Sequence, residues 1–516
     1  MAMNDGGRHL WVWATSVMAL GLVAGGCGDD QGSAPAVDAR ASATAAAAPA
    51  ANGRPTVRPL APLSGSMSGS RQPTFHYTPA HKATVDICDD RACAHIVAEL
   101  AGDQGVAQPA TPLRAGVLFW RVVTNQATSA VWQLTIPGRD TGGDIAWGVV
   151  PDFNGDGLAD VAVGSPGEGS QSVFVFNGAS FLGVTPDETL TGGALFGKAV
   201  ASAGDVNGDG FVDLAVASGS SPGSVTVFLG GPAGPGGAGT VLSPGDVTSG
   251  FGATMASAGD VNGDGYADLL VGGVEHAQVF LGGPAGLATT AALTLTGGGT
   301  GDASVVQGPS DVDADGRPDL YVGGALYLSS AGGLAAEPGF NIALGSFAGD
   351  ENGDGFGDFA SFRVFPGSPE GIDTSGDLFI QAGEIALGTA GDANGDGFSD
   401  IISSLSSIEG VTDRQRVYFG APGFCGSNGC RPFVGIPIPG HDFNGGNLTA
   451  FLGSVGDANG DGLDDLVAAT PDTGQGYFYG SVAGSGAEAF ASPTWSFPTG
   501  FGSSFAALFG SVRPLQ

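Results

Sequence analysis

Short apolar runs separated by glycine-rich polar turns make up the chain from about residue 140 onward. In a typical unit a first apolar run ends at Gly204, a polar turn follows, and a second run, Leu214-Ala-Val216, leaves the turn. A third run carries aromatic residues, as in Val225-Thr-Val-Phe228, and a more variable fourth run completes the unit. Four short runs bounded by turn residues predict four β-strands, which is the pattern of a propeller blade.

A nine-residue pattern, Asp-x-Asn-Gly-Asp-Gly-x-x-Asp, fills the polar turn between the first two runs of each unit. Six copies and one near-copy, the one at Asp311, begin at Asp152, Asp205, Asp260, Asp311, Asp350, Asp392 and Asp457. A repeat spacing of roughly 40–65 residues indicates one supersecondary unit per copy. We therefore predict an all-β fold in which a seven-bladed β-propeller spans residues 140–516. Closing the ring buries both faces of each blade and places all seven loops on one rim.

The polar turns carry the chemistry of a cation site. In the first copy Asp152, Asn154, Asp156 and Asp160 occupy positions one, three, five and nine, and the backbone carbonyl of Leu158 occupies position seven. Three carboxylates packed this closely repel one another unless a cation neutralises them. Oxygen ligands at alternate positions of a glycine-turned loop favour Ca²⁺ over Mg²⁺, which demands stricter octahedral geometry.

The same register assigns four side-chain ligands to every copy, for up to seven Ca²⁺ ions. The predicted ligands are Asp152, Asn154, Asp156, Asp160, Asp205, Asn207, Asp209, Asp213, Asp260, Asn262, Asp264, Asp268, Asp311, Asp313, Asp315, Asp319, Asp350, Asn352, Asp354, Asp358, Asp392, Asn394, Asp396, Asp400, Asp457, Asn459, Asp461 and Asp465. The copy at Asp311 departs from the pattern, because Asp313 replaces the Asn, Ala314 replaces the first Gly, and Pro318 is present.

The loop sequences allow two other interpretations. An EF-hand needs Glu at position twelve and flanking helices, whereas the first copy has Val163 there and strand-like runs on both sides. Acidic turns that hold no metal remain the alternative for any single copy.

The repeats resemble a known family. Phe196-Gly197, the acidic loop at Asp205 and the Gly-Gly-Pro turn at Gly230 recur in one order along the chain. This order resembles the FG-GAP repeats of integrin α-chain propellers and their bacterial, VCBS-type relatives, over about residues 140–516. The resemblance implies a β-propeller, commonly seven-bladed, with a cation in the loop between the first two strands of many blades. A partial unit that opens at Phe501-Gly502 is a candidate for the strand that closes the ring.

Residues 55–138 differ from the repeats, with fewer glycines and two tryptophans, Trp120 and Trp132. Short alternating runs separated by turn residues predict a small β-sandwich. On pattern alone the segment resembles a fibronectin type III or immunoglobulin-like module. Such a module is most often a spacer, and a ligand-binding role is the alternative.

The N-terminal 27 residues are typical of an export signal. Arg8 precedes an apolar stretch over residues 10–23 that is too short to span a bilayer. Val23-Ala-Gly-Gly-Cys27 resembles a bacterial lipoprotein cleavage box, which implies lipidation of Cys27, although Ala24 stands where Leu is usual. An ordinary cleaved signal with a chance cysteine is the alternative. By the same resemblance Gly28 favours sorting to the outer membrane. Residues 28–54 predict a flexible, disordered tether.

The charge and the cysteine content limit which classes of binding partner and which cellular compartment suit this chain. A formal net charge of −34 argues against nucleic acid, whose phosphates need a basic surface. Besides Cys27, the cysteines form two pairs five residues apart, which predict disulfides Cys88–Cys93 and Cys425–Cys430 in an oxidising compartment. A zinc site is the competing interpretation, and the spacing does not suit it.

Evidence for catalysis is weak in the sequence. Gly219-Ser-Ser221-Pro-Gly223 matches the nucleophile pattern Gly-x-Ser-x-Gly, but no helix pattern follows Ser221 as a nucleophile elbow requires. His276 and His441 are the imidazoles of the repeat region, and both are more often loop or packing residues.

We expect a non-enzymatic protein with no catalytic residue, and the resemblance to integrin α-chain propellers implies an adhesion or ligand-binding platform. We expect a monomeric outer-membrane lipoprotein of the bacterial cell envelope, periplasmic or surface-exposed, that touches the membrane through its lipid alone. Its partner would be an unknown protein or polysaccharide at a face of the propeller. The alternatives are an envelope hydrolase or lyase built on the same ring, since fold does not fix function, and a purely structural surface protein.

Overall fold

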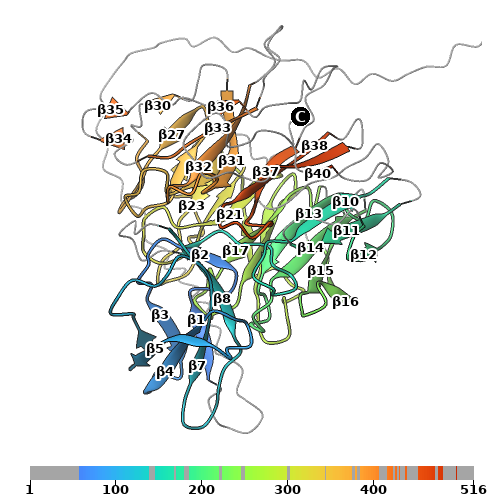
Figure 1. Ribbon diagram of the computed structural model, residues 1–516. Helices are drawn as coiled ribbons and strands as arrows, with labels where there is room; N and C mark the ends of the chain where they lie inside the picture. The colour runs from blue at the N-terminus through green and yellow to red at the C-terminus, as the bar shows by residue number, and fades with distance from the viewer. Residues whose placement is uncertain are drawn as a thin grey trace, which may run out of the picture. The chain divides into compact units, whose positions relative to one another are not determined.

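The structure is a computed structural model, and it describes part of the chain. The described residues are 57–138, most of 146–421 with short gaps in connecting loops, and the segments 425–426, 429–430, 436–437, 451–470, 475–479 and 495–496. The predicted signal with Cys27, the tether, Ser221, His441 and the partial unit at Phe501 lie outside these residues. In the described part every regular element is a β-strand (Figure 1), which confirms the all-β prediction. No helix there could span a membrane.

The first module consists of two sheets around one core. Trp120 and Trp132 are fully buried and meet edge to face with their ring centroids 5.7 Å apart, and Phe75 packs 4.8 Å from Trp120. The smaller sheet has the order β1 (Arg58–Ala61), β3 (Phe75–Thr78), β6 (Val106–Ala107). The larger sheet has the order β5 (Ile96–Gly102), β4 (Ala83–Cys88), β7 (Gly116–Val123), β8 (Trp132–Ile136), β2 (Ser66–Ser68), β9 (Ala146–Trp147). Assignment of the module to a fibronectin or immunoglobulin type stays a prediction.

One antiparallel sheet accompanies each acidic loop. Apolar residues fill both faces of the inner strands, as in β14 (Asp213–Ser218), where Leu214 to Ala217 are all buried. The sheets are β10 (Val161–Ser165), β11 (Ser172–Phe176), β12 (Glu188–Thr191); β13 (Ala199–Gly204), β14 (Asp213–Ser218), β15 (Ser224–Leu229), β16 (Gly236–Leu242); β17 (Met255–Gly259), β18 (Asp268–Val271), β19 (Ala277–Phe280), β20 (Leu293–Leu295); and β21 (Val306–Ser310), β22 (Asp319–Val322), β23 (Ala325–Tyr327), β24 (Phe340–Asn341).

The later repeats follow the same order with added hairpins. Their sheets are β25 (Ser346–Gly349), β26 (Asp358–Ala360), β27 (Arg363–Phe365), β30 (Leu378–Phe379); β31 (Glu384–Gly391), β32 (Asp400–Leu405), β33 (Gln415–Tyr418), β36 (Ile436–Pro437); and β37 (Phe451–Gly456), β38 (Asp465–Thr470), β39 (Gln475–Tyr479), β40 (Trp495–Ser496). The hairpins are β28 (Gly367–Ser368) with β29 (Gly371–Ile372) and β34 (Cys425–Gly426) with β35 (Gly429–Cys430).

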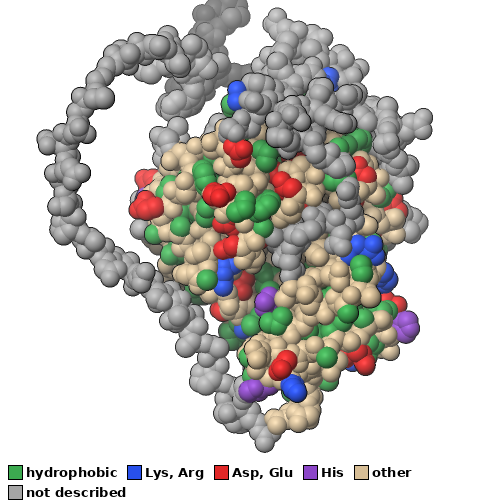
Figure 2. Space-filling model, turned by 90° about the vertical axis from the view of Figure 1, so that its left-hand side faces the viewer, with side chains coloured by type: hydrophobic (Ala, Val, Ile, Leu, Met, Phe, Trp, Pro, Cys, Tyr) green, Lys and Arg blue, Asp and Glu red, His purple; other side chains and the backbone are tan. Residues whose placement is uncertain are grey.

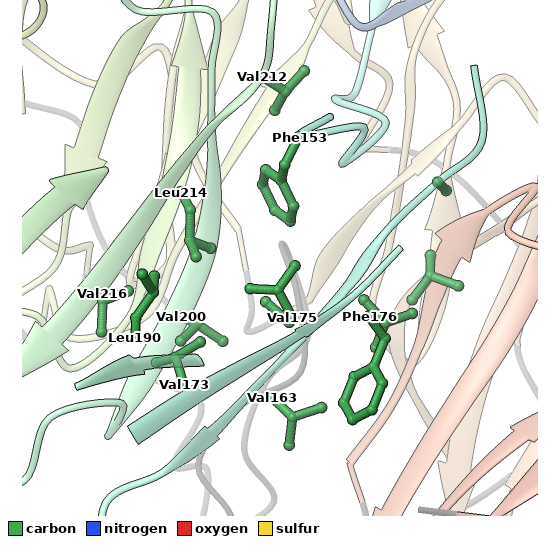
Figure 3. Close-up of a cluster of buried hydrophobic side chains, with 14 of the residues drawn as sticks. Phe153, Val163, Val173, Val175, Phe176, Leu190, Val200, Val212, Leu214 and Val216 are labelled. Atoms are coloured by element: carbon green, nitrogen blue, oxygen red, sulfur yellow. The ribbon is translucent and has the colours of Figure 1, made fainter. Parts of the chain in front are cut away.

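Buried apolar side chains join the sheet of β10 to both of its neighbours. Val175 and Phe176 lie in one cluster with Val200 and Leu214 of the next sheet (Figure 3). The same cluster includes Val467 of the last sheet. The first and last repeats are therefore in contact, as in a closed propeller.

The segments that lead into the acidic loops surround a central cavity of about 120 Å³. The residue three places before each acidic loop lines this cavity in every repeat: Val149, Ser202, Ser257, Gly308, Phe347, Thr389 and Ser454. Equivalent positions therefore face one common axis, which is the geometry of a β-propeller.

The two cysteine pairs lie on local turns. Cys88 and Cys93 form a disulfide with their Cα atoms 5.1 Å apart. Cys425 and Cys430 are opposite each other in the pairing of β34 with β35, and their side chains lie outside the described residues.

Candidate metal centre

The first Asp of each loop folds the loop around its own carboxylate. In the copy between β13 and β14, Asp205 Oδ1 accepts hydrogen bonds from the backbone N–H groups of Gly208, at 2.7 Å, and Asp209, at 3.1 Å. Its Oδ2 accepts from Gly210 N–H at 2.7 Å. Gly208 and Gly210 have φ of 72° and 98°, in the left-handed region that favours glycine. The Asp and the two glycines thus specify this turn together.

The Asn and Asp at positions three and five extend the turn toward solvent. Asn207 Nδ2 donates to Asp209 Oδ2 at 2.8 Å, and Asn207 Oδ1 accepts from Asp209 N–H at 2.9 Å. Asp209 Oδ1 in turn accepts from Phe211 N–H at 3.0 Å. Asp209 is exposed, so a cation could enter the loop from this side.

The last Asp of the pattern, which the sequence predicts only as a ligand, also has a structural role. Asp213 is fully buried; its Oδ2 accepts from Val206 N–H at 2.8 Å and its Oδ1 from Gly230 N–H at 2.7 Å. It therefore ties the acidic loop to the turn that follows the third strand. The equivalent two backbone bonds are made by Asp160, Asp268, Asp319, Asp358 and Asp400.

Burial disfavours the charged form of the first and the last Asp of the loop. It raises the pKa of Asp205 to about 7, with repulsion from Asp209 as the next cause. It raises the pKa of Asp213 well above the usual range, assisted by the charge of Asp205. Backbone N–H donors only partly offset these effects. The pKa of the first Asp is raised to about 6 at Asp152, Asp260, Asp350 and Asp392 and to about 7 at Asp311, chiefly by burial.

The residues present fit a hard cation. Asp152, Asp156 and Asp160 each offer a carboxylate oxygen, and these oxygens all lie within 4.8 Å of one another. Asp311, Asp313 and Asp315 do the same in the near-copy. All of the predicted ligand residues are described, and the same turn holds positions one, three, five and nine in every copy. A divalent cation would neutralise the repulsion that the pKa values report.

Backbone hydrogen bonds join six of the seven pairs of neighbouring loops. The N–H group at position eight of one loop donates to the position-one carbonyl of the preceding loop. The pairs are Val212 to Asp152 at 3.4 Å, Ala267 to Asp205 at 3.0 Å, Gly357 to Asp311 at 2.7 Å, Ser399 to Asp350 at 3.0 Å, Asp464 to Asp392 at 3.3 Å, and Ala159 to Asp457 at 2.9 Å. In the fourth repeat position eight is Pro318, which has no N–H group to donate. The loops accordingly lie side by side on one rim.

Side chains also link one loop to the next. Tyr266, at position seven of the third loop, lies over Gly208 of the second, where an added Cβ would come 2.8 Å from Tyr266 Cε1. Phe211 lies in the same way over Gly155 of the first loop. The position-four glycine is therefore required by close packing as well as by its backbone conformation. The pattern alone did not reveal this packing.

The central cavity offers little acid–base chemistry. Among the described residues that line it, Asp464 is the sole ionisable one, and burial raises its pKa to about 7. His276 lies on the β18–β19 turn, away from the cavity lining.

Comparison with known proteins agrees with the repeat geometry. A family model described as FG-GAP-like repeat matches residues 152–216, 205–271 and 260–322. The chain is 37% identical over 165 residues to integrin alpha-IIb of Mus musculus, a match that covers 27% of this chain and 16% of that protein. It is 32% identical over 162 residues to integrin alpha-5 of Xenopus laevis, covering 26% and 15% of the two chains. The chain thus matches less than two thirds of the length of these relatives.

A solved structure of a Bacillus licheniformis rhamnogalacturonan lyase is similar over 82% of this chain and 90% of that chain, at 12% identity and a TM-score of 0.34. So low a TM-score supports no conclusion about activity. The family match, the integrin relatives and the ring of equivalent loops lead to one assignment. The chain carries FG-GAP-like repeats over residues 152–322 and folds as a β-propeller.

Proposed function

We propose that this protein is a calcium-binding propeller of the bacterial cell envelope that serves as a non-enzymatic ligand-binding or adhesion platform. The observation that carries the calcium assignment is the series of buried carboxylates, seen most clearly at Asp205 and Asp213, whose pKa values are raised by burial and mutual repulsion. A bound Ca²⁺ would supply the positive charge that lets these carboxylates ionise inside the fold.

Calcium is favoured over other cations by the donor set. Every predicted ligand is an oxygen, and each of six loops includes a neutral Asn. Flexible all-oxygen loops suit Ca²⁺, whereas Mg²⁺ keeps several waters and Zn²⁺ prefers nitrogen and sulfur ligands. The position-seven carbonyl and the side chains of positions one, three, five and nine would hold the ion.

Hydrogen bonds between the loops explain how cation binding would support ligand binding. Asp213 ties its loop to the turn after β15, and the position-eight N–H groups tie each loop to its neighbour. A cation that fixes one loop would therefore stiffen the rim rather than one turn. A stiff rim presents loops and strand ends for binding at low entropic cost.

A non-enzymatic role is favoured by the central cavity. General acid–base catalysis usually needs two groups with different pKa values in one pocket, and the described lining provides Asp464 alone. The integrin relatives favour ligand binding as the function. An unknown protein or polysaccharide remains the proposed ligand, since the surface in Figure 2 shows acidic side chains spread over the face rather than a basic patch.

Envelope localisation rests on the sequence around Cys27. The export signal and the cleavage-box resemblance support lipidation there, and the oxidised Cys88–Cys93 pair suits the same compartment. Metabolic labelling with a palmitate analogue tests this part of the proposal. Label should appear in the wild type and be absent from Cys27→Ser; label in neither protein would refute the anchor.

The binding function is tested by counting ions and measuring ligand capture in the same sample. Native mass spectrometry of the full chain in micromolar to millimolar calcium should show several added Ca²⁺ ions, up to seven, which a chelator removes. Immobilised protein should then retain purified envelope polysaccharide or envelope protein in calcium and release it with the chelator. No added ions would refute the metal sites, and capture unaffected by the chelator would refute a calcium-dependent platform.

A further inference from the structure

Arg91 of the first module contacts the second acidic loop. Its guanidinium donates to the carbonyl oxygen of Gly210 and lies over the ring of Phe211, with Cζ 3.9 Å from the ring centroid. These two residues are positions six and seven of that loop. Burial lowers the pKa of Arg91, and the neighbouring carboxylates of Asp152 and Asp205 partly offset the effect.

Arg58 makes the same pair of contacts with the third loop. It donates to Gly265 O at 3.1 Å and to Asp264 O, and its Cζ lies 4.0 Å from the centroid of the Tyr266 ring. Two arginines from one module thus recognise the same feature of two consecutive loops. That feature is the outward carbonyls next to an aromatic residue at position seven.

Two uncharged groups add to this contact surface. Ser64 Oγ donates to Gly210 O at 2.9 Å, and Trp132 Nε1 donates to Gly208 O at 3.4 Å. The side chains of Arg58, Ser64, Arg91 and Trp132 all donate hydrogen bonds to backbone carbonyls of positions four to six. The side-chain oxygens of positions one, three, five and nine and the position-seven carbonyl are not used. One loop can therefore hold a cation and an arginine at the same time.

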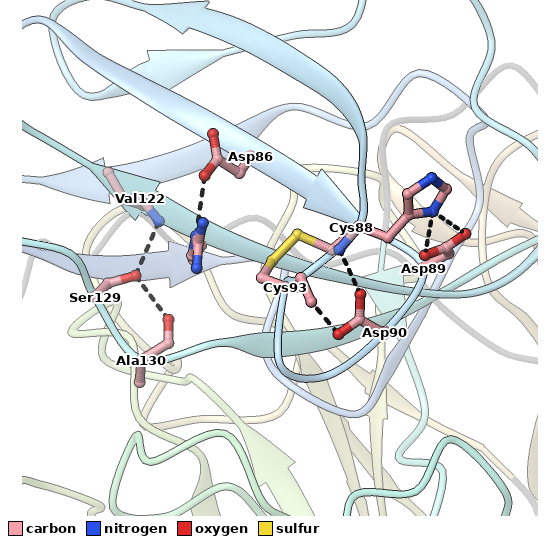
Figure 4. Close-up of a disulfide and its surroundings, with 11 residues drawn as sticks. Asp86, Cys88, Asp89, Asp90, Cys93, Val122, Ser129 and Ala130 are labelled. Atoms are coloured by element: carbon pink, nitrogen blue, oxygen red, sulfur yellow. Dashed lines mark hydrogen bonds and ion pairs between the residues drawn. A yellow bond between two sulfur atoms is a disulfide. The ribbon is translucent and has the colours of Figure 1, made fainter.

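The turn that carries Arg91 is fixed on the module side. The disulfide between Cys88 and Cys93 closes it, and Asp90 accepts hydrogen bonds from Ala94 N–H at 3.1 Å and His95 N–H at 2.7 Å (Figure 4). Cys88 and Cys93 are buried against Phe119. Arg91 is thus presented to the loop by a constrained turn, as a recognition element needs.

We propose that the first module is a clamp that seats on the second and third acidic loops and that its seating is coupled to cation binding there. The proposal rests on the proposed function, in which the loops hold Ca²⁺. The module is then part of the metal machinery of the propeller and not a spacer. By reciprocity, the seated module strengthens cation binding in those two loops.

The sign of the coupling follows from what the arginines contact. Without a cation, mutual repulsion loosens the exposed middle of the loop, and the carbonyls of positions four to six lie in that middle. Charge-assisted hydrogen bonds and a stacked guanidinium need fixed partners. An emptied loop attracts the arginines more strongly, but their hydrogen bonds go to backbone carbonyls and not to the carboxylates. The loss of fixed geometry is therefore the larger effect, and removing the cation should loosen the clamp.

Hydrogen exchange of the full chain, followed by mass spectrometry over a calcium titration, tests this coupling loop by loop. Peptides from the loops at Asp205 and Asp260 report the clamped sites, and peptides from the loops at Asp350 and Asp392 report sites that the module does not contact among the described residues. In Arg58→Lys/Arg91→Lys the charge is kept while the paired carbonyl contact and stacking are lost. The calcium midpoint of protection at the two clamped loops should rise several-fold in this variant, with the other two unchanged.

Arg114→Ala is the matched control, because Arg114 is exposed and its hydrogen bond, to Val117 O, stays within the module. It should leave every midpoint unchanged, and slow exchange in β4 and β7 should show that the module is folded in both variants. If the calcium midpoints of Arg58→Lys/Arg91→Lys equal those of the wild type at all four loops, or fall at the two clamped loops, the coupling is overturned while calcium binding stays intact. Absence of calcium protection at any loop of the wild type would instead overturn the proposed function.

Discussion

The backbone N–H group of Ala159 donates to the carbonyl oxygen of Asp457 at 2.9 Å, and so the first acidic loop is bonded to the last. The two residues are 298 positions apart in the sequence numbering, and they make the same position-eight to position-one contact that joins neighbouring loops elsewhere on the rim. Ring closure in the described structure therefore uses the acidic loops themselves.

Replacing Ala159 by Pro should weaken this closure. The substitution removes one N–H donor and leaves the Asp457 carbonyl without that partner, at a cost of roughly 0.5–1.5 kcal/mol in the free energy of unfolding. Pro318 occupies the equivalent position naturally, so the backbone there accepts proline. Thermal unfolding of the full chain measures the effect.

The reverse change is the control for ring closure. Pro318→Ala restores a donor opposite the Asp260 carbonyl, and it should leave stability unchanged or raise it. A melting temperature for Ala159→Pro equal to that of the wild type would show that the first and last loops are not bonded in solution.

The two acidic positions of one loop should respond differently to a chelator. Asp213→Ala leaves the N–H groups of Val206 and Gly230 without acceptors inside the fold, which should cost about 2 kcal/mol or more with or without calcium. Asp209→Ala removes an exposed carboxylate, and it should lower stability in calcium only. Unfolding curves in calcium and in chelator separate the two roles, and identical behaviour of the two variants would contradict them.

Stability of the calcium-free protein should fall as the pH rises. Burial raises the pKa of Asp152 to about 6 and of Asp205 to about 7, above their values in an unfolded chain near 4. The folded state then binds more protons than the unfolded state between about pH 4 and 7, so the free energy of unfolding decreases across that range.

Calcium should remove this pH dependence, because a bound cation favours the ionised carboxylates. Its binding should also release protons, which calorimetric titration in buffers of different ionisation enthalpy detects. A calcium-free protein that gains stability from pH 5 to pH 8 would contradict the raised pKa values.

Gly208→Ala should destabilise the second loop. Its φ of 72° is unfavourable for a residue with a Cβ, and the new atom would meet Tyr266 Cε1 at 2.8 Å. A loss of about 1–2 kcal/mol is expected. The fourth loop offers the opposite change, since Ala314 already has a φ of 55° at the same position. Ala314→Gly should therefore stabilise the protein modestly, and a gain for Gly208→Ala would show that the packing of Tyr266 is not as described.

The sequence was sufficient for the features that repeat. The spacing of the Asp-rich loops and the order of apolar runs identify the strands and the repeat unit, because each depends on residues close in the chain. The assignment of oxygen ligands within the loops stays a prediction. The Cys88–Cys93 turn is also local, and its sequence pattern suffices to suggest the bond that the structure contains.

Features that depend on distant parts of the chain could not be predicted in this way. The anchoring of Asp213 to Gly230 needs the turn after β15 to return to the loop. The contacts of Arg58 and Arg91 need the first module to reach the rim, and no periodicity encodes that approach. A Gly follows the third strand in five repeats, and Ser329 takes its place in the fourth; this recurrence was the one local signal of the anchor that the sequence carried.

We propose that the loops are stable when a cation neutralises their carboxylates. Differential scanning calorimetry of the full chain in millimolar calcium and in excess chelator, at pH 7.5, tests it most directly. Calcium should raise the melting temperature by many degrees, since each site filled at 100-fold excess over its Kd contributes about 2.7 kcal/mol. Coincident melting curves in calcium and in chelator would contradict stabilisation of the loops by a bound cation.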